Sequence, residues 1–132
     1  PNVSPKGTFQ ALDAHRLVFA EIRSPRTIEN LAHDPRVEVN MVDVFSRKGA
    51  RFRGEASFHD KGSAFARACC PRWKDLFGED LMSRAHGYVL IQVTSAKPLI
   101  TPAYDVGAEE RQLREDYLAR FTAMQESWLS QS

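Results

Sequence analysis

The sequence predicts a mainly β, α+β domain, in which five or six antiparallel strands form a small barrel with two short helices and one long C-terminal helix. Short segments of alternating or continuous apolar residues follow one another through most of the chain. Tight polar turns join them, and strands in such succession favour a small antiparallel barrel over a parallel sheet. Near the C-terminus the apolar spacing becomes that of an amphipathic helix.

The composition fits one globular domain that spans residues 1–132 and has a core of its own. Hydrophobic residues make up 42% of the chain and charged residues 27%, which is ordinary for a soluble protein. The net charge of +1 gives no reason to expect nucleic acid or an anionic membrane as a partner. Any basic site must therefore be a local cluster.

The cysteines and histidines indicate neither a disulfide nor a metal site. Cys69 and Cys70 are adjacent, which makes them poor partners for each other and favours reduced thiols in a cytoplasmic protein. The four histidines show no metal-ligand spacing, so no metal is expected. No stretch has the length of a transmembrane helix or the pattern of a signal peptide, and we expect neither.

The first part of the chain predicts an edge strand and a hairpin. Pro1 to Gly7 mixes proline with β-prone residues and is typical of an extended edge segment. Thr8 to Leu12 is a candidate strand, and Asp13 to His15 is a plausible hairpin loop. Leu17 to Ile22 is short, apolar and flanked by charge, as expected of a buried strand.

A short helix is expected directly after this strand. Ser24 suits the N-cap position, and Pro25 suits the first helical position, where its missing N–H costs nothing. The helix should extend from Pro25 to about His33, because the residue before Pro35 disfavours the α region.

The start of that helix is a candidate anion site. A helix N-terminus has unpaired N–H groups and a partial positive charge. Arg23, Arg26 and Thr27 add charged and hydroxyl donors at the same end, and the arginine fork matches phosphate well. A capped surface helix with solvated arginines is the alternative interpretation of this stretch taken alone.

Two alternating strands follow, joined by the basic turn Phe45 to Gly49. Arg36 to Val44 and Ala50 to His59 both have a period of two, and a short turn between two such strands indicates an antiparallel pair. In the second strand, Ala50, Phe52, Gly54, Ala56 and Phe58 should share one face, with Arg51, Arg53, Glu55, Ser57 and His59 on the other.

The next segments predict a helix and a strand. Ser63 to Phe77 has helical spacing, which Pro71 is expected to break. Gly87 to Ser95 contains a nearly continuous apolar run, as in a strand buried on both faces. Lys97 to Asp105, with two prolines, should be a surface connection.

Ala108 to about Leu129 predicts the C-terminal helix. Its apolar residues recur at steps of three and four and form one stripe, which should cover the core or a partner subunit. The stripe consists of Leu113, Tyr117, Phe121, Met124 and Trp128.

Three ordered motifs resemble the pyridoxamine 5′-phosphate oxidase-like family of flavin-binding split barrels: PNVSPKG, FAEIRSPRTIENLAHDPRV and FSRKGARFRG. The resemblance covers roughly Pro1 to Ala56, and GYVLIQVTSAKPL and PAYDVG agree with small bacterial members. It implies a six-stranded antiparallel split β-barrel with short helices and a C-terminal amphipathic helix. It also implies a homodimer with two FMN molecules at the subunit interface.

The resemblance also implies which residues hold FMN. In the family, a lysine on one strand and the next strand–turn–helix grasp the phosphate, while a later basic turn, often from the other subunit, approaches the flavin. The matching positions are Ser4, Lys6, Arg23, Ser24, Arg26 and Thr27 for the phosphate, and Lys48, Gly49 and Arg51 for the basic turn.

The ring of FMN needs further contacts. It is flat and largely apolar with polar edges, and the strand end at Glu21 and Ile22 could supply N–H groups to it. A nearby cation such as Lys48 or Arg51 would stabilise the reduced anionic flavin.

The function implied is an FMN-dependent oxidoreductase that acts on a small organic substrate, with a nicotinamide or oxygen as redox partner. The alternatives are a flavin-binding protein without turnover, acting as store, sensor or electron carrier, and a protein that holds a deazaflavin or haem in the same fold. Nucleic-acid binding by the arginine-rich turns is disfavoured, because the clusters lack interleaved aromatic residues. The sequence does not identify the substrate.

Three features depart from the family pattern. No counterpart of the C-terminal region that holds pyridoxamine phosphate in the full oxidases is found. Thr27 stands where the oxidases usually have a second cation, which should weaken or reorient phosphate binding. The strand that usually precedes PNVSPKG is not found in residues 1–132, so either the barrel lacks one N-terminal edge strand or that strand lies before Pro1.

Overall fold

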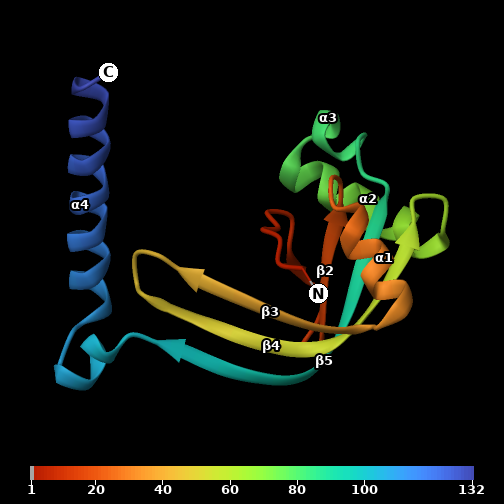
Figure 1. The fold of residues 1–132 in the computed structure, drawn as a ribbon, viewed down its shortest axis with the longest axis horizontal. Coiled ribbons are helices and arrows are strands. Elements are labelled where there is room, and N and C mark those ends of the chain that lie inside the picture. The colour runs from red at the N-terminus through yellow and green to blue at the C-terminus, as the bar shows by residue number, and fades with distance from the viewer. Residues whose placement is uncertain (1) are drawn as a thin grey trace. The chain divides into compact units, whose positions relative to one another are not determined.

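The computed structural model describes residues 2–132 and shows five strands, four α-helices and one 3-10 helix (Figure 1). Pro1, the first residue of the predicted edge segment, lies outside the described residues. The elements in order are β1 (Gln10–Ala11), β2 (Arg16–Glu21), α1 (Pro25–His33), β3 (Arg36–Asp43), β4 (Lys48–Asp60), α2 (Ala64–Phe77), α3 (Glu79–Met82), β5 (Gly87–Ile100), η1 (Pro102–Val106) and α4 (Glu110–Ser130).

The strands form one sheet in the order β1-β2-β5-β4-β3. β1 pairs antiparallel with β2, with Gln10 opposite Val18, and β2 pairs antiparallel with β5 from Arg16 opposite Gln92 to Glu21 opposite Gly87. The predicted mainly antiparallel α+β fold is therefore confirmed in its class.

The predicted six-stranded split barrel is not confirmed among residues 2–132, where the sheet has five strands and two open edges. Residues 2–9 form no strand. One cause of this lies in Thr8, whose side chain makes both backbone hydrogen bonds of Ala20 in β2. Thr8 Oγ1 accepts from the Ala20 N–H at 3.0 Å and donates to the Ala20 carbonyl at 3.1 Å. A side chain thus takes the place that a neighbouring backbone would have in a ladder.

Contacts divide the chain into two compact units. Unit 1 comprises Pro1–Glu38 and Arg53–Ser95, and unit 2 comprises Val39–Phe52 and Ala96–Ser132. Each unit is described by itself below.

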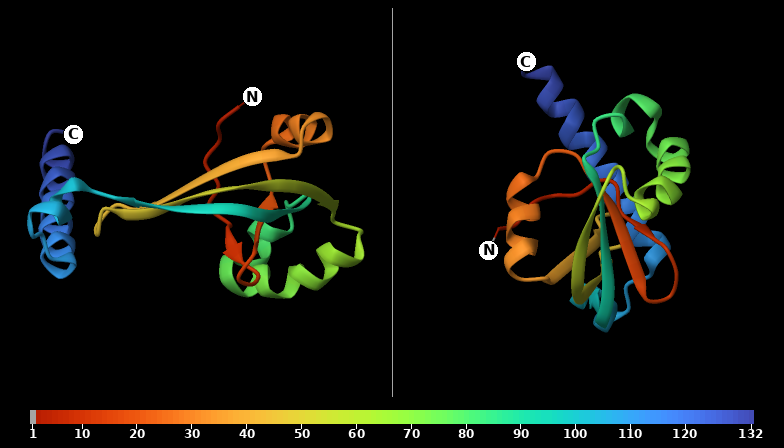
Figure 2. Two further views of the ribbon diagram at one scale, coloured as in Figure 1. Left: turned by 90° about the horizontal axis from the view of Figure 1, so that it is seen from below. Right: turned by 90° about the vertical axis from the view of Figure 1, so that its right-hand side faces the viewer.

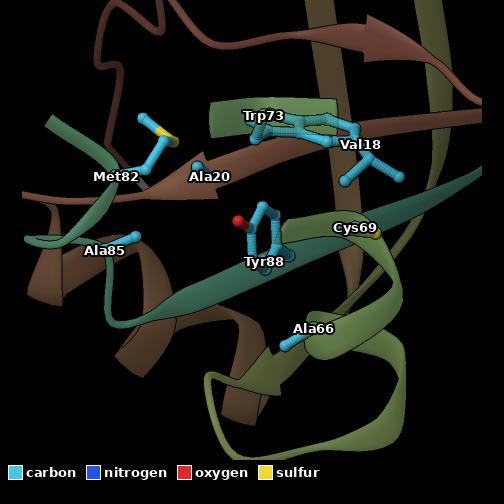
Figure 3. Packing of buried hydrophobic residues seen from close by; sticks show 8 residues of the cluster. All are labelled: Val18, Ala20, Ala66, Cys69, Trp73, Met82, Ala85 and Tyr88. Atoms are coloured by element: carbon cyan, nitrogen blue, oxygen red, sulfur yellow. The ribbon is translucent and has the colours of Figure 1, made fainter. Parts of the chain in front are cut away.

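The core of unit 1 lies where α2 and α3 cover β2 and β5 (Figure 3). Trp73 of α2 is fully buried and meets Tyr88 of β5 edge-on, with ring centroids 5.4 Å apart. Val18 and Ala20 of β2 complete the layer beneath it. α1 lies on the opposite side of the sheet from α2 (Figure 2).

The predicted helix after β2 is confirmed at both ends, since α1 begins at Pro25 and ends at His33. Ser24 occupies the N-cap position, but its side chain makes no hydrogen bond to the helix. The backbone of Ser24 does this instead, because its carbonyl accepts from the Thr27 N–H at 3.0 Å.

Two predictions about proline were wrong. Pro71 lies inside α2 and does not break it. Pro71 and Arg67 are both exposed. The Arg67 carbonyl loses its helical donor at Pro71, and water can replace the missing bond.

Pro98 lies inside β5, which continues to Ile100 instead of ending at Ser95. β5 is paired with β2 only as far as Gln92, so one edge is open there and a missing N–H costs little.

Unit 2 contains the turn between β3 and β4, the 3-10 helix and α4. Both strands alternate between exposed and partly buried residues as predicted. Arg47 in the turn has a φ of 58°, and Gly49 passes so close to β3 that a Cβ there would lie 1.9 Å from the Met41 carbonyl oxygen. The start of β4 therefore requires glycine at this position.

The predicted apolar stripe of α4 is only half covered. Its first half packs on the turn, where Phe121 meets Phe45 edge-on at 5.9 Å and Arg47 lies 4.9 Å from the ring of Tyr117. Met124 and Trp128 in the second half are 61% and 68% exposed. α4 has no buried residue, so the prediction that this helix covers the core is wrong. The other prediction, that it covers a partner subunit, stays a prediction.

Candidate functional site

The predicted anion site is built around three side chains at the end of β2. Lys6 Nζ donates to Ser24 Oγ and lies 3.4 Å from Glu21 Oε2. The backbone N–H of Ser24 donates to Glu21 Oε1. Lys6 also lies 5.3 Å from the ring centroid of Phe19, which orients its ammonium group. The structure therefore brings Lys6 and Ser24, two of the predicted phosphate contacts, into direct contact.

Glu21 takes part in this cluster through its side chain, which the prediction did not use. The predicted contact of its backbone N–H with the flavin ring stays a prediction, and the structure shows in addition a carboxylate with no exposed side-chain surface that is paired with Lys6. The Glu21 carbonyl accepts from the His86 N–H at 2.8 Å. A buried carboxylate needs such partners, and Lys6 and Ser24 supply them.

The segment that carries Ser4 and Lys6 is anchored to the core through Thr8. The indole N–H of Trp73 donates to the Thr8 carbonyl at 2.8 Å. The Thr8 side chain is hydrogen-bonded to both the N–H and the carbonyl of Ala20. These long-range bonds fix an otherwise irregular segment. No local sequence signal predicts them.

A cavity of about 580 Å³ opens beside this cluster. It is lined by Ile22 and Arg23 from the end of β2, Leu81 of α3, and Arg84 and His86 before β5. Ile22 and Arg23 are predicted site residues, whereas the other three are brought in by the pairing of β2 with β5. The cavity is therefore basic, with apolar wall residues, and its size suits a cofactor.

Arg26 and Thr27 lie in the first turn of α1, where Arg26 is exposed and Thr27 is partly buried. Because no side chain caps the helix, its partial positive charge remains directed at the space before Ser24. Ser4 lies partly buried in the segment before Thr8. Unit 1 thus holds all the predicted phosphate contacts.

A second cavity of unit 1, about 530 Å³ in volume, is a poorer candidate for an anion. Both arginines that line it are already paired, Arg36 with Asp34 at 2.6 Å and Arg53 with Glu38 at 3.0 Å, and Glu55 adds a third carboxylate. The hydrogen bonds from Arg36 lower the pKa of Asp34 to about 2. The carboxylates of this cavity outnumber its two arginines, which disfavours an anion there.

The predicted basic turn lies in unit 2, where it is paired with acidic groups. Lys48 Nζ lies 2.8 Å from Glu110 Oε2 and 4.6 Å from the ring centroid of Tyr104. The hydrogen bond from Glu110 raises the pKa of Lys48, and Lys48 in turn lowers the pKa of Glu110. Arg114 joins Glu110 to Asp43, at 3.0 and 2.7 Å.

The other two predicted residues of this turn lie in β4. Arg51 donates from Nε to Asn40 Oδ1 at 3.1 Å. Gly49 lies against the backbone of Met41. Lys48, Gly49 and Arg51 therefore form one local group, while the phosphate contacts form another in unit 1.

The buried cysteine and a search for metal ligands give no second candidate site within residues 2–132. Burial raises the pKa of Cys69, which keeps its thiol protonated. In the part of the chain that the structure describes, no three His, Cys, Asp or Glu side chains gather so as to hold a metal ion. None of the helices within residues 2–132 has the length and apolar character to cross a membrane.

The fold is an α+β fold with a mainly antiparallel sheet, and the predicted basic residues Lys6, Arg23 and Arg26 lie near the end of β2. The sequence profile of the pyridoxamine 5′-phosphate oxidase family matches residues 1–99. The chain therefore belongs to this family, as the three motifs predicted. A search of curated proteins finds no match.

Solved structures with similar folds include HupZ of Group A Streptococcus, with 23% identity, a TM-score of 0.64 and coverage of 76% of each chain. A variant of the same protein gives a TM-score of 0.63, with 75% of this chain and 79% of that one covered at 23% identity. A Lactobacillus delbrueckii protein, provisionally assigned as a pyridoxamine 5′-phosphate oxidase, is 22% identical with a TM-score of 0.55, over 71% and 70% of the chains. At these identities the likeness concerns the fold.

Proposed function

We propose that this protein is an FMN-binding oxidoreductase that acts on a small organic substrate, with a nicotinamide or oxygen as its redox partner. The observation that supports it best is the meeting of Lys6, Ser24 and the open start of α1 beside a basic cavity. These donors match a phosphate monoester, and the family match makes FMN the natural candidate.

The residues present fit FMN in charge and donor type. Lys6, Arg23 and Arg26 supply cations, and Ser4, Ser24 and Thr27 supply hydroxyl groups for the phosphate. Ile22 and Leu81 give the adjoining cavity apolar walls, while Arg84 and His86 give it polar donors. One feature opposes the phosphate, namely the Glu21 carboxylate at the same corner.

FMN, when bound, supplies the redox chemistry of its ring, so no side-chain nucleophile is required. The chain's own residues would bind the phosphate, line the adjoining cavity and provide positive charge beside it. Lys48, Gly49 and Arg51 would approach the flavin from the second subunit in the proposed dimer.

The experiment is a spectrum and a titration of the purified full chain. We expect a yellow protein, or a colourless one that quenches the fluorescence of added FMN with saturation. Bleaching by NADH or NADPH without oxygen, followed by recovery in air, would support an oxidoreductase. Bound flavin that does not bleach would support a store, sensor or electron carrier, and failure to take up FMN would overturn the proposal.

We further propose a homodimer with FMN at the subunit interface, in which a second copy covers unit 2. Among residues 2–132, every buried hydrophobic side chain lies in unit 1, whereas most exposed large ones lie in unit 2. A high share of exposed large apolar side chains in one unit supports an interaction surface there. They are Val42, Val44, Ile100, Val106, Leu118, Met124, Trp128 and Leu129.

Analytical ultracentrifugation tests this surface. Trp128→Asp should shift the protein toward the monomer, because it places a charge on the exposed half of α4. Leu76→Asp is the matched control, since Leu76 is 51% exposed but lies on α2 in unit 1. A monomeric wild-type protein, or equal effects of the two substitutions, would contradict the assignment of this surface.

A further inference from the structure

The corner that should receive a phosphate already contains an anion. Glu21 Oε1 accepts the Ser24 N–H, and Glu21 Oε2 lies 3.4 Å from Lys6 Nζ. Lys6 Nζ in turn donates to Ser24 Oγ. The charged and polar donors best placed for a phosphate are therefore occupied by Glu21 or by each other.

The ion pair is well protected from solvent. The side chain of Glu21 has no exposed surface and that of Lys6 is 13% exposed. Electrostatic interactions weaken little in such a place, because water and salt ions screen them poorly. A phosphate dianion entering here must therefore either take Lys6 and Ser24 away from Glu21 or remain close to a second negative charge.

We propose that the Glu21 carboxylate competes with the ligand's phosphate for Lys6 and Ser24. This competition lowers the affinity for phosphate-bearing ligands and keeps the flavin exchangeable. The inference rests on the proposed FMN site and concerns how tightly that site holds its phosphate. In the ligand-free chain Glu21 neutralises Lys6, and on binding the phosphate replaces the carboxylate as the partner of Lys6.

The wild-type protein provides the first test, through the ratio of its affinities for FMN and riboflavin. Riboflavin has the same ring without the phosphate, so the ratio isolates the phosphate contribution. Three unopposed charge-assisted hydrogen bonds would contribute a factor of about a thousand or more. With Glu21 competing, we expect the wild-type ratio to stay below about a hundredfold. A ratio above a thousand overturns the proposal.

Glu21→Gln provides the second test, because glutamine keeps the shape and can still accept the Ser24 N–H while removing the charge. We expect FMN to bind roughly ten- to a hundredfold more tightly, the range for one charge-assisted hydrogen bond, and riboflavin to be unaffected. Glu29→Gln is the control, because it removes the same charge from an exposed glutamate of α1. It should change FMN affinity less than about twofold, as expected for a solvent-screened charge.

Inorganic phosphate is a probe that does not depend on flavin binding. Isothermal titration at pH 8 should show tighter phosphate binding by Glu21→Gln than by the wild type. If no flavin binds but phosphate binding tightens in this way, the role of Glu21 holds and the proposed FMN function fails. If FMN binds and Glu21→Gln leaves its affinity unchanged or weaker, the function holds and the competitor role is wrong.

Discussion

Trp73→Phe should strongly destabilise the protein, because Trp73 performs two functions in unit 1. Its ring is fully buried against Tyr88, and its indole N–H is bonded to the Thr8 carbonyl at 2.8 Å. Phenylalanine keeps an aromatic ring but has no N–H and leaves a gap. The buried Thr8 carbonyl, now unpaired, should cost about 1–3 kcal/mol. The lost volume should cost about 1–2 kcal/mol more.

We therefore expect the free energy of unfolding to fall by about 2–5 kcal/mol. Urea denaturation followed by circular dichroism measures it. Trp128→Phe is the matched control, because Trp128 is 68% exposed, and should change stability by less than about 0.5 kcal/mol. A loss below about 1 kcal/mol for Trp73→Phe, or equal losses for the two variants, would refute the assigned contacts.

The same substitution should also affect the ligand site. Thr8 fixes the segment that carries Lys6, and Trp73 fixes Thr8. Under conditions where Trp73→Phe is still folded, FMN affinity should fall although Trp73 itself does not line the cavity. Unchanged affinity would mean that the segment is held by its other bonds.

Three further expectations concern single residues. Arg26→Ala should weaken FMN binding by about 1.5–3 kcal/mol, nearer the lower value because the side chain is exposed, while Arg67→Ala on α2 should leave a fluorescence titration unchanged. Gly54→Ala should destabilise the protein by more than about 3 kcal/mol in urea, because its Cβ would lie 2.2 Å from the Gln92 carbonyl oxygen, a backbone atom that cannot rotate away; a loss below about 1 kcal/mol would contradict that approach. Burial raises the pKa of Tyr88 from 10.0 to about 12, so its neutral form is favoured by folding. The stability from this group is present below pH 10.0 and is lost as the pH rises to about 12, and Tyr88→Phe should lose less stability over that range than the wild type.

Local patterns predicted the elements that depend on local physics. Ser24 and Pro25 gave the start of α1, and Pro35 its end, because capping and proline geometry act within a few residues. The period of two gave both strands of the β3–β4 hairpin. These features need no information about distant parts of the chain.

The features that were missed depend on distant contacts. Glu21 ends an apolar strand, and only the return of Lys6 beside it makes its burial possible. Arg84 and His86 join the cavity because β5 pairs with β2. The tolerance of Pro71 depends on solvent around α2, and proline alone suggested a break.

The uneven placement of buried side chains should be visible in amide hydrogen exchange. Amides in the core strands of unit 1 should exchange only when the whole protein unfolds, whereas those of α4 have no buried side chain to protect them and should exchange through local opening. Covering α4 with a second copy would slow its exchange and would make it depend on protein concentration. The exchange rates of α4 would then report subunit association, while those of β2 and β5 report folding.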